Sequence, residues 1–320
     1  MDFNQKFAIG IDIGGTNTAF GIVDSTGNIV FRNRLSTRDY ITIDSFISAI
    51  EESVKPYIEL TGIDHLTGIG IGAPNGNLQT GVIEYAPNLP WEDNLPMGNL
   101  FSKKFNKPCR ITNDANAAAI GEMTYGAAKG LKDFMVITLG TGVGSGIISN
   151  GNLLDGFDGY AGELGHTIVI PEGRKHWGTN VCGCLEAYAS ATGIVITANE
   201  FLNCNESTPS LLQSYAPNNI TAQLIFECAC KGDKIAIEIF QYTGKILGVA
   251  LANFALFSSP EAIIFFGGLT KAKDFWMNTA KEYMDKNLPP NFRNKTKLIV
   301  SNLDEADAAI LGAASLVMMK

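Results

Sequence analysis

Two short loops rich in glycine and threonine carry the residue types best suited to binding phosphate. Gly14-Gly15-Thr16-Asn17 and Gly140-Thr141-Gly142 each follow an apolar, strand-like run. Phosphates need several backbone N–H donors that converge on a small volume, and glycine permits that approach because it has no side chain in the way. Neither loop continues into Lys-Ser or Lys-Thr, so neither is a Walker A loop. One such loop is more often a structural turn, but two with similar flanks predict a nucleotide site.

Two carboxylates accompany these loops. Asp12 ends the first apolar run, and Asp114 lies in ITNDANAAAIGE, after an apolar strand and at the start of an alanine-rich helix. Phosphoryl transfer to a hydroxyl requires a carboxylate that accepts the hydroxyl proton, and a helix dipole would help to keep Asp114 ionised for that role. Asp12 could hold a water of the Mg²⁺ that accompanies ATP. Local sequence leaves two alternatives open: a solvated Asp12, and a helix cap formed by Asn113 or Asp114.

Strands and helices alternate around these residues. Apolar β-branched runs predict strands at residues 7–13, 65–74 and 134–140, and helical spacing predicts a helix at 43–58. When the two loops are aligned, Gly15-Thr16 pairs with Gly140-Thr141, and residues 21–23 pair with 146–148 at the same spacing. The pattern predicts an internally duplicated chain, with generic glycine-rich hairpin composition as the alternative.

Length and composition narrow the class of protein. The 320 residues suit two domains of roughly 150 residues each. Net charge is -8, with 24 basic and 32 acidic residues and no basic run, which argues against nucleic acid as a partner. MDFNQK lacks the features of a signal peptide, and no uninterrupted apolar run reaches the roughly 18 residues of a membrane span. We therefore expect a cytoplasmic protein with no membrane partner.

Six cysteines are too few for a disulfide scaffold, so each is expected to be a buried apolar residue or a metal ligand. For four of them packing is the simpler expectation: Cys109, Cys204, Cys228 and Cys230. The last two lie in TAQLIFECAC, which reads as a core helix.

Seven motifs together resemble one family. The sequence contains, in this order, DIGGTNT, GAPN, APNLPW, NDANAAAIGE, LGTGVGSG, GELGH and GCLEAYAS. Over nearly its whole length it is similar to the ROK family of sugar kinases and sugar-responsive repressors. The resemblance implies an α/β protein with the actin-like ATPase fold, two RNase H-like domains around a nucleotide cleft. With the hinge placed near Asn113 by motif order, we expect a smaller domain of residues 1–113 plus a C-terminal helix at about 303–320, and a larger one of residues 114–302.

The resemblance also implies roles for individual residues. It makes Asp114 the base that deprotonates the primary hydroxyl of a sugar, with Asn113 holding a ring hydroxyl. The other implied sugar contacts are Asn75, Asn88, Glu163, His166 and Glu186. The implied ATP and phosphate contacts are Asp12, Gly14, Gly15, Thr16, Asn17, Gly140, Thr141, Gly142, Gly267 and Gly268.

The zinc motif departs from the family pattern, which reads His, then Cys-x-Cys-Gly-x-x-Gly-Cys, then Leu-Glu. Here the corresponding stretch is GRKHWGTNVCGCLE, in which Trp177 and Thr179 occupy two of the cysteine positions. A shifted tetrahedral set would consist of His166, His176, Cys182 and Cys184. The altered motif leaves two alternatives: structural zinc held by this shifted set, or no zinc, in which case His166 must be held by packing or by another hydrogen bond.

The activity implied is ATP- and Mg²⁺-dependent phosphorylation of a hexose at its 6-hydroxyl, with glucose as the first choice. Kinases for N-acetylmannosamine, N-acetylglucosamine or fructose are alternatives, as is a non-catalytic, sugar-sensing ROK regulator. Only 11 residues precede Asp12, too few for the DNA-binding domain of a repressor. The resemblance also implies a homodimer or homotetramer.

Overall fold

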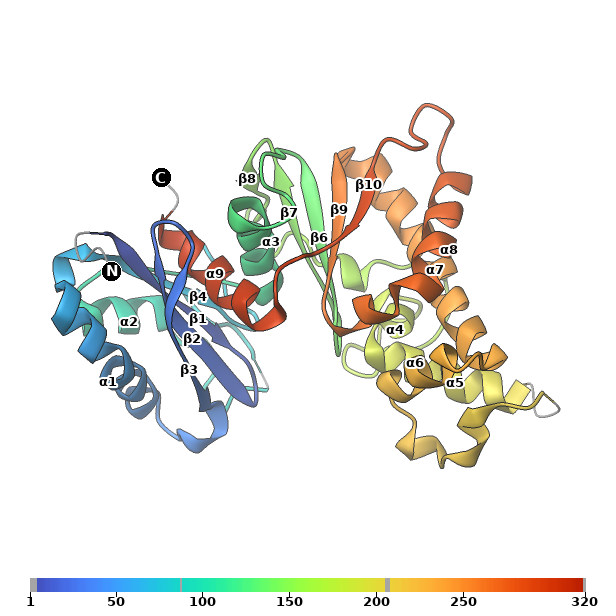
Figure 1. The fold of residues 1–320 in the computed structure, drawn as a ribbon, viewed down its shortest axis with the longest axis horizontal. Helices are drawn as coiled ribbons and strands as arrows, with labels where there is room; N and C mark the ends of the chain where they lie inside the picture. The colour runs from blue at the N-terminus through green and yellow to red at the C-terminus, as the bar shows by residue number, and fades with distance from the viewer. Residues whose placement is uncertain (1–4, 87, 205–207, 319–320) are drawn as a thin grey trace. The chain divides into compact units, whose positions relative to one another are not determined.

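The computed structural model describes residues 5–86, 88–204 and 208–318. It contains two five-stranded sheets, and the chain divides into two compact units (Figure 1). Unit 1 comprises residues 1–132, 146–162 and 301–320, and unit 2 comprises residues 133–145 and 163–300. In this division the helix that begins at Asp114 falls in unit 1, whereas the sequence placed the start of the second domain there; the hinge near Asn113 stays a prediction.

The first sheet has the strand order β3-β2-β1-β4-β5. Its strands are β1 (Phe7–Ile13), β2 (Asn17–Asp24), β3 (Ile29–Ser36), β4 (Leu66–Gly72) and β5 (Cys109–Thr112). β2 is antiparallel to β1 and β3, while β1, β4 and β5 are mutually parallel. β1 is buried along almost its whole length because it is the central strand and both faces of the sheet are covered.

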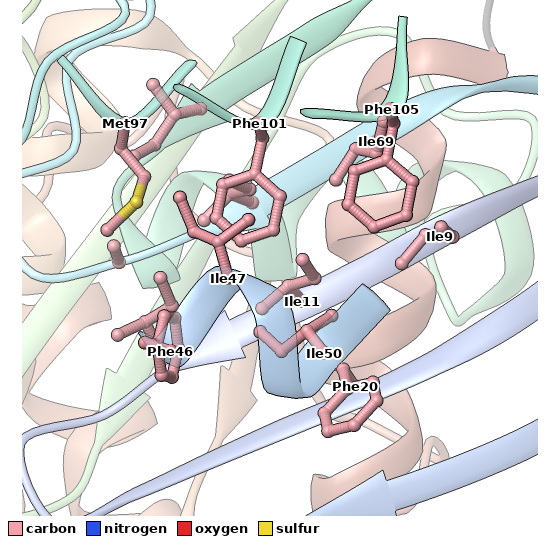
Figure 2. Packing of buried hydrophobic residues seen from close by; sticks show 14 of the residues in the cluster. Ile9, Ile11, Phe20, Phe46, Ile47, Ile50, Ile69, Met97, Phe101 and Phe105 are labelled. Carbon is pink, nitrogen blue, oxygen red and sulfur yellow. The ribbon is translucent and has the colours of Figure 1, made fainter. Parts of the chain in front are cut away.

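Helices cover both faces of this sheet. On one face, α1 (Ile43–Thr61) and α2 (Met97–Phe105) pack Phe46, Ile50 and Phe101 into the core that includes Ile9 and Ile11 of β1 (Figure 2). On the other face lies α9 (Glu305–Met318), which in turn packs on α3 (Asp114–Tyr125). A Cβ atom at Gly10 or Gly70 would collide with the backbone of α9, so glycine at these strand positions allows the helix to lie directly on the sheet.

The second sheet repeats the topology of the first. Its order is β10-β9-β6-β7-β8, with strands β6 (Phe134–Leu139), β7 (Val143–Ser149), β8 (Asn152–Leu153), β9 (Ala262–Phe266) and β10 (Lys297–Val300). In each sheet the first strand in sequence is central, flanked by the second and third on one side and the fourth and fifth on the other. The duplication predicted from the two loops is therefore present in the sheet topology.

The helices of unit 2 are α4 (Glu186–Ala189), α5 (Ala191–Cys204), α6 (Ala222–Cys230), α7 (Lys234–Ser258) and α8 (Lys273–Lys286). α7 is long and apolar enough to cross a membrane by length and composition, but most of its apolar window is buried, and it packs extensively on α8. A core helix that is buried inside a protein meets the same criterion of length and composition, so this finding is weak evidence for a membrane span.

Candidate active site

The parallel strands of the first sheet bring two carboxylates together. Asp12, Gly72 and Thr112 are register partners near the carboxyl ends of β1, β4 and β5, and Asp114 follows β5 by two residues. A Cβ atom at Gly72 would lie 3.8 Å from both Asp12 Oδ1 and Asp114 Cα, so both residues border the space that this glycine leaves open. Ligand sites of α/β sheets commonly lie at this edge.

Both carboxylates bind protons more tightly than ordinary aspartates. Removal from water, and then the negative charge of Asp114, raise the pKa of Asp12 from 3.8 to about 7. Asp114 is solvent-accessible, but the surrounding protein removes part of the hydration of its carboxylate, and this raises its pKa. Hydrogen bonds from backbone N–H groups lower the pKa by a smaller amount. Two close carboxylates with raised pKa values form a site suited to accepting a proton and to binding a cation.

One of the two candidate residues forms the helix cap expected at the start of α3. Asn113 is the cap, because its Oδ1 accepts a hydrogen bond of 2.7 Å from the N–H of Asn116. Asp114 is the first helical residue, and its Oδ1 accepts from the N–H of Ala115 at 2.9 Å. The cap therefore does not use the Asp114 carboxylate.

The first loop is packed against its surroundings. The N–H of Gly14 donates to the carbonyl of Asn17 at 3.0 Å, and Thr37 Oγ1 donates to the carbonyl of Gly14 at 2.8 Å. A Cβ atom at Gly15 would lie 2.9 Å from Cβ of Asn88. Asn88, expected from the sequence at the sugar pocket, thus lies against the loop. Asn75 lies in a turn, where its Nδ2 donates to the carbonyl of Tyr85 at 2.8 Å.

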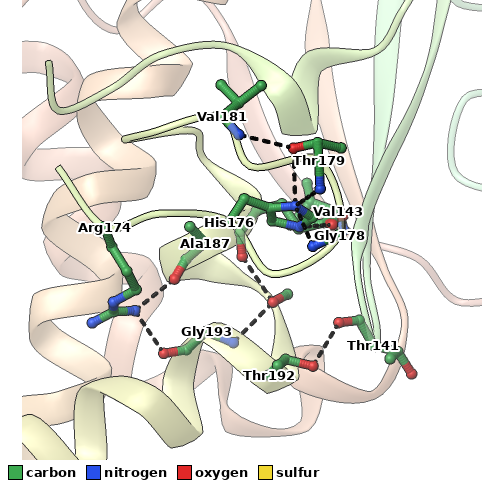
Figure 3. A network of polar contacts seen from close by, with 12 residues as sticks. Thr141, Val143, Arg174, His176, Gly178, Thr179, Val181, Ala187, Thr192 and Gly193 are labelled. Atoms are coloured by element: carbon green, nitrogen blue, oxygen red, sulfur yellow. Dashed lines mark hydrogen bonds and ion pairs between the residues drawn. The ribbon is translucent and has the colours of Figure 1, made fainter. Parts of the chain in front are cut away.

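The second loop borders an open cavity instead. The carbonyl of Gly140 accepts from the N–H of Ala191 at 2.8 Å. The carbonyl of Thr141 accepts from Thr192 Oγ1 at 3.2 Å (Figure 3). A Cβ atom at Gly140 would meet nothing within 4 Å. The cavity has a volume of about 410 Å³ and is lined by Leu139, Gly140, Thr141, Ala191, Ala222, Gln223, Phe226, Glu227, Phe240, Gly268, Leu269, Lys271 and Ala272. Apolar walls with a few polar groups are typical of small-molecule sites.

The turn after β9 brings Gly267 and Gly268 to this region. Gly267 has φ 101, which favours glycine, and a Cβ atom there would lie 2.7 Å from the carbonyl oxygen of Leu139. Gly268 lines the cavity.

Sequence reasoning missed the contribution of α6 to the cavity. TAQLIFECAC was expected to be core, and α6 does bury Ile225 and Cys228, but it also supplies Gln223 and Phe226 to the lining. The expectation of packing was also wrong for Cys204 and Cys230, which are exposed. Gln223 and Glu227, one turn apart in an otherwise apolar helix, are the signal that could have indicated a polar rim.

The remaining predicted sugar contacts gather near the second loop within unit 2. Glu186 begins α4, and its Oε2 accepts the N–H of Val143 at 2.6 Å. Its Oε1 lies 2.6 Å from Nε2 of His176. The rings of His166 and His176 have centroids 5.7 Å apart, and Glu163 precedes the short turn Leu164–His166.

The predicted zinc set is not brought together as metal ligands. Across residues 5–86, 88–204 and 208–318, no three His, Cys, Asp or Glu side chains form a group that could hold a metal ion. Cys184 is buried, Cys182 is exposed, and the His176 ring is engaged by hydrogen bonds to protein atoms. These residues do not fit a zinc site.

Comparison with known proteins places these observations in a family. The ROK family profile matches residues 8–320. The chain is 33% identical over 319 residues to the glucokinase of Halalkalibacterium halodurans, covering 98% of this chain and 96% of that one. It is 29% identical to the xylose repressor of Bacillus spizizenii, covering 99% of this chain and 78% of the repressor.

A solved structure gives the same result. The crystal structure of a ROK family glucokinase from Streptomyces griseus, in complex with glucose and AMPPNP, matches with a TM-score of 0.78 and 32% identity, covering 97% of this chain and 98% of that one. The neighbouring ROK sugar kinases have the actin-like ATPase fold, so the predicted fold class is confirmed.

Proposed function

The chain belongs to the ROK family, and we propose that it is an ATP-dependent glucokinase that phosphorylates the 6-hydroxyl of glucose. The observation that carries the proposal is the pair Asp12 and Asp114 at the carboxyl edge of the first sheet, in a chain 33% identical to a glucokinase. Phosphoryl transfer requires little covalent work from the protein beyond positioning, charge stabilisation and acceptance of one proton.

In this proposal Asp114 is the general base. Its carboxylate accepts the proton of the 6-hydroxyl while the oxygen attacks the γ-phosphorus of ATP, the bond from that phosphorus to the bridging oxygen breaks, and ADP leaves. A raised pKa suits a base that works near neutral pH. The carboxylate remains available because Asn113, and not Asp114, caps the helix.

Asp12 would hold the magnesium ion of MgATP through a water molecule. Two carboxylates with mutually unfavourable charge fit a divalent cation, which takes oxygen ligands. When bound, the ion neutralises charge on the transferring phosphoryl group. Asp12 is suited to this role by its place near the end of β1, next to the loop Gly14-Gly15-Thr16-Asn17, where its carboxylate would hold the hydrated cation.

The 410 Å³ cavity of unit 2 is the proposed site for the adenosine part of ATP. Phe226 and Leu269 offer apolar surface to a base, and Gln223 and Lys271 offer polar groups at its rim. The phosphates would bind to the loop Gly140-Thr141-Gly142, which borders this cavity, and the adenosine part would lie next to Gly267 and Gly268.

The proposed sugar contacts are amides, carboxylates and an imidazole, which suit a polyhydroxylated ligand. Because Oδ1 of Asn113 accepts from the helix, its NH₂ group would donate to a ring hydroxyl. Glu163, His166 and Glu186 would contact further hydroxyls, and Asn75 and Asn88 would shape the pocket.

A second candidate is a sugar-binding regulator without catalysis, which the 29% identity to a xylose repressor favours. Among kinases, those for N-acetylmannosamine, N-acetylglucosamine and fructose are the alternatives. We also propose a cytoplasmic location, a homodimer or homotetramer, and no nucleic acid or membrane partner.

The test is a coupled assay of ADP release over a panel of hexoses and acetamidohexoses with ATP and Mg²⁺. The proposal expects glucose to give the highest kcat/KM. A different preferred sugar would replace glucose in the proposal, while glucose binding in calorimetry without turnover of any sugar would favour the regulator.

A further inference from the structure

The segment from Arg174 to Cys184 forms a small hairpin where the ROK pattern has its zinc-binding cysteines. Lys175 and Cys182 form an antiparallel bridge, and the N–H of His176 donates to the carbonyl of Val181 at 2.8 Å. Arg174 anchors the start of the hairpin, because its guanidinium donates to the carbonyls of Ala187 and Gly193 (Figure 3). The hairpin is therefore tied to α4 and α5 by hydrogen bonds.

His176 lies at the centre of this hairpin and is 3% exposed. Its Nδ1 accepts hydrogen bonds from the backbone N–H groups of Gly178 at 3.2 Å and Thr179 at 3.0 Å. A nitrogen that accepts two N–H bonds carries no proton, so the proton of a neutral ring is on Nε2. The geometry therefore assigns one tautomer.

In that tautomer the ring donates to Glu186. The Nε2–H bond points at Oε1 of Glu186, 2.6 Å away, while Oε2 of the same carboxylate accepts the N–H of Val143 at 2.6 Å. One carboxylate thus joins the hairpin to the loop after β6. Neither ring nitrogen retains a lone pair for a metal ion, since one lone pair is used and the other nitrogen is protonated.

We propose that the hydrogen bonds of His176 hold this hairpin together in place of a zinc ion, and that His176 is the positioning residue for Glu186. Thr179, at one of the two substituted cysteine positions, contributes through its N–H and through Oγ1, which lies 3.0 Å from Nδ1 of His176. The part of this inference that concerns glucose binding rests on the proposed function, in which Glu186 contacts the sugar. The tautomer and the absence of a metal requirement do not depend on it.

The first measurement uses the unaltered protein. ¹⁵N NMR of histidine-labelled protein should show His176 as the Nε2–H tautomer, and only three histidines need to be assigned. Elemental analysis should find no stoichiometric zinc, and EDTA should leave the melting temperature unchanged. An Nδ1–H tautomer, or one tightly held zinc per chain whose removal lowers the melting temperature, would overturn the proposal.

The second measurement uses variants and glucose as the probe. His176→Leu removes both sets of hydrogen bonds and should weaken glucose binding, measured by calorimetry, roughly 10- to 100-fold, the value of a hydrogen bond to a charged group. His176→Gln keeps an N–H donor for Glu186 and should restore most of that affinity. Lys175→Ala, an exposed neighbour in the same hairpin, is the matched control and should bind glucose normally.

These outcomes separate the two proposals. Equal glucose affinity in folded His176→Gln and His176→Leu would remove His176 from its positioning role. If His176→Leu does not fold, the glucose affinity of His176→Gln and the tautomer of His176 in the unaltered protein decide whether His176 positions Glu186. If the unaltered protein neither binds nor phosphorylates glucose, the proposed function fails, while the tautomer and zinc content still test the hairpin.

Discussion

The two sheets share one strand order but differ in the chemistry at the end of their first strands. Asp12 lies three residues before Gly15, whereas the residue three before Gly140 is Ile137, which is fully buried. In the first sheet this position contributes to a pair of carboxylates, and in the second it belongs to the apolar core. The duplicated backbone therefore supplies a scaffold, and substitutions at equivalent positions give each copy its own role.

The two loops also use glycine for different reasons. Gly15 is crowded by Asn88, so glycine there serves the packing of the free protein. Gly140 borders open space, so glycine there is not required by packing. Its absence of a side chain is explained if a ligand approaches the backbone, as proposed for the phosphates of ATP. Substitutions in each copy of the fold can break or sharpen this contrast.

Asp114→Asn should have the largest effect. The amide can still accept a hydrogen bond but cannot take a proton, so kcat should fall about 10³-fold or more, with glucose KM nearly unchanged. Steady-state kinetics checks this, with the exposed Asp64→Asn as a carboxylate control. A near-normal kcat would remove Asp114 from the role of base.

Asp12→Asn should lower kcat about 100-fold and raise the Mg²⁺ concentration needed for half-maximal rate, both measured by steady-state kinetics.

The same variant tests the pKa of Asp12. Folding raises this pKa from 3.8 to about 7, so between these two pH values Asp12 is protonated in the folded state and ionised in the unfolded state. Wild-type stability should therefore decline as pH rises from about 4 to about 7. Denaturant unfolding at pH 8 should find the variant more stable by about 1 to 2 kcal/mol, with a smaller difference at pH 4. Equal stability at both pH values would contradict the assigned pKa.

Phe226→Ala should raise the KM for ATP about 10-fold, through loss of apolar contact with the base, and should leave glucose KM unchanged. The control is Phe257→Ala, since that ring is 77% exposed in the same unit. A change in glucose KM without one in ATP KM would contradict the assignment of the cavity to adenosine.

Gly15→Ala and Gly140→Ala form the smallest and most direct test of the two loops. The first should destabilise the protein by about 1 to 3 kcal/mol because its Cβ meets Asn88. The second should change the free energy of unfolding by less than about 0.5 kcal/mol, yet raise the KM for ATP. Unfolding curves and ATP kinetics on both variants check the contrast; similar losses of stability in both would remove it.

The sequence predicted features that depend on local order along the chain. The strand ends, both loops and the start of α3 follow from apolar runs and the residues that come next, so residue order singles out Asp12 and Asp114 as candidates, while the resemblance supplies the role of Asp114 as base. The resemblance added Glu186 and His166. What could not be predicted depends on which segments fold together: the partnership of His176 with Glu186, and the part of α6 that faces the cavity instead of the core.

The position of α9 on the first sheet has a consequence for how the chain is made. The strands that it covers are synthesised long before the helix itself, so this face of the sheet cannot be covered until α9 has been made. Contacts so distant in sequence make folding of unit 1 slow. During translation one face of that sheet stays uncovered, and this apolar surface is the place where a nascent chain of this protein would depend on chaperones.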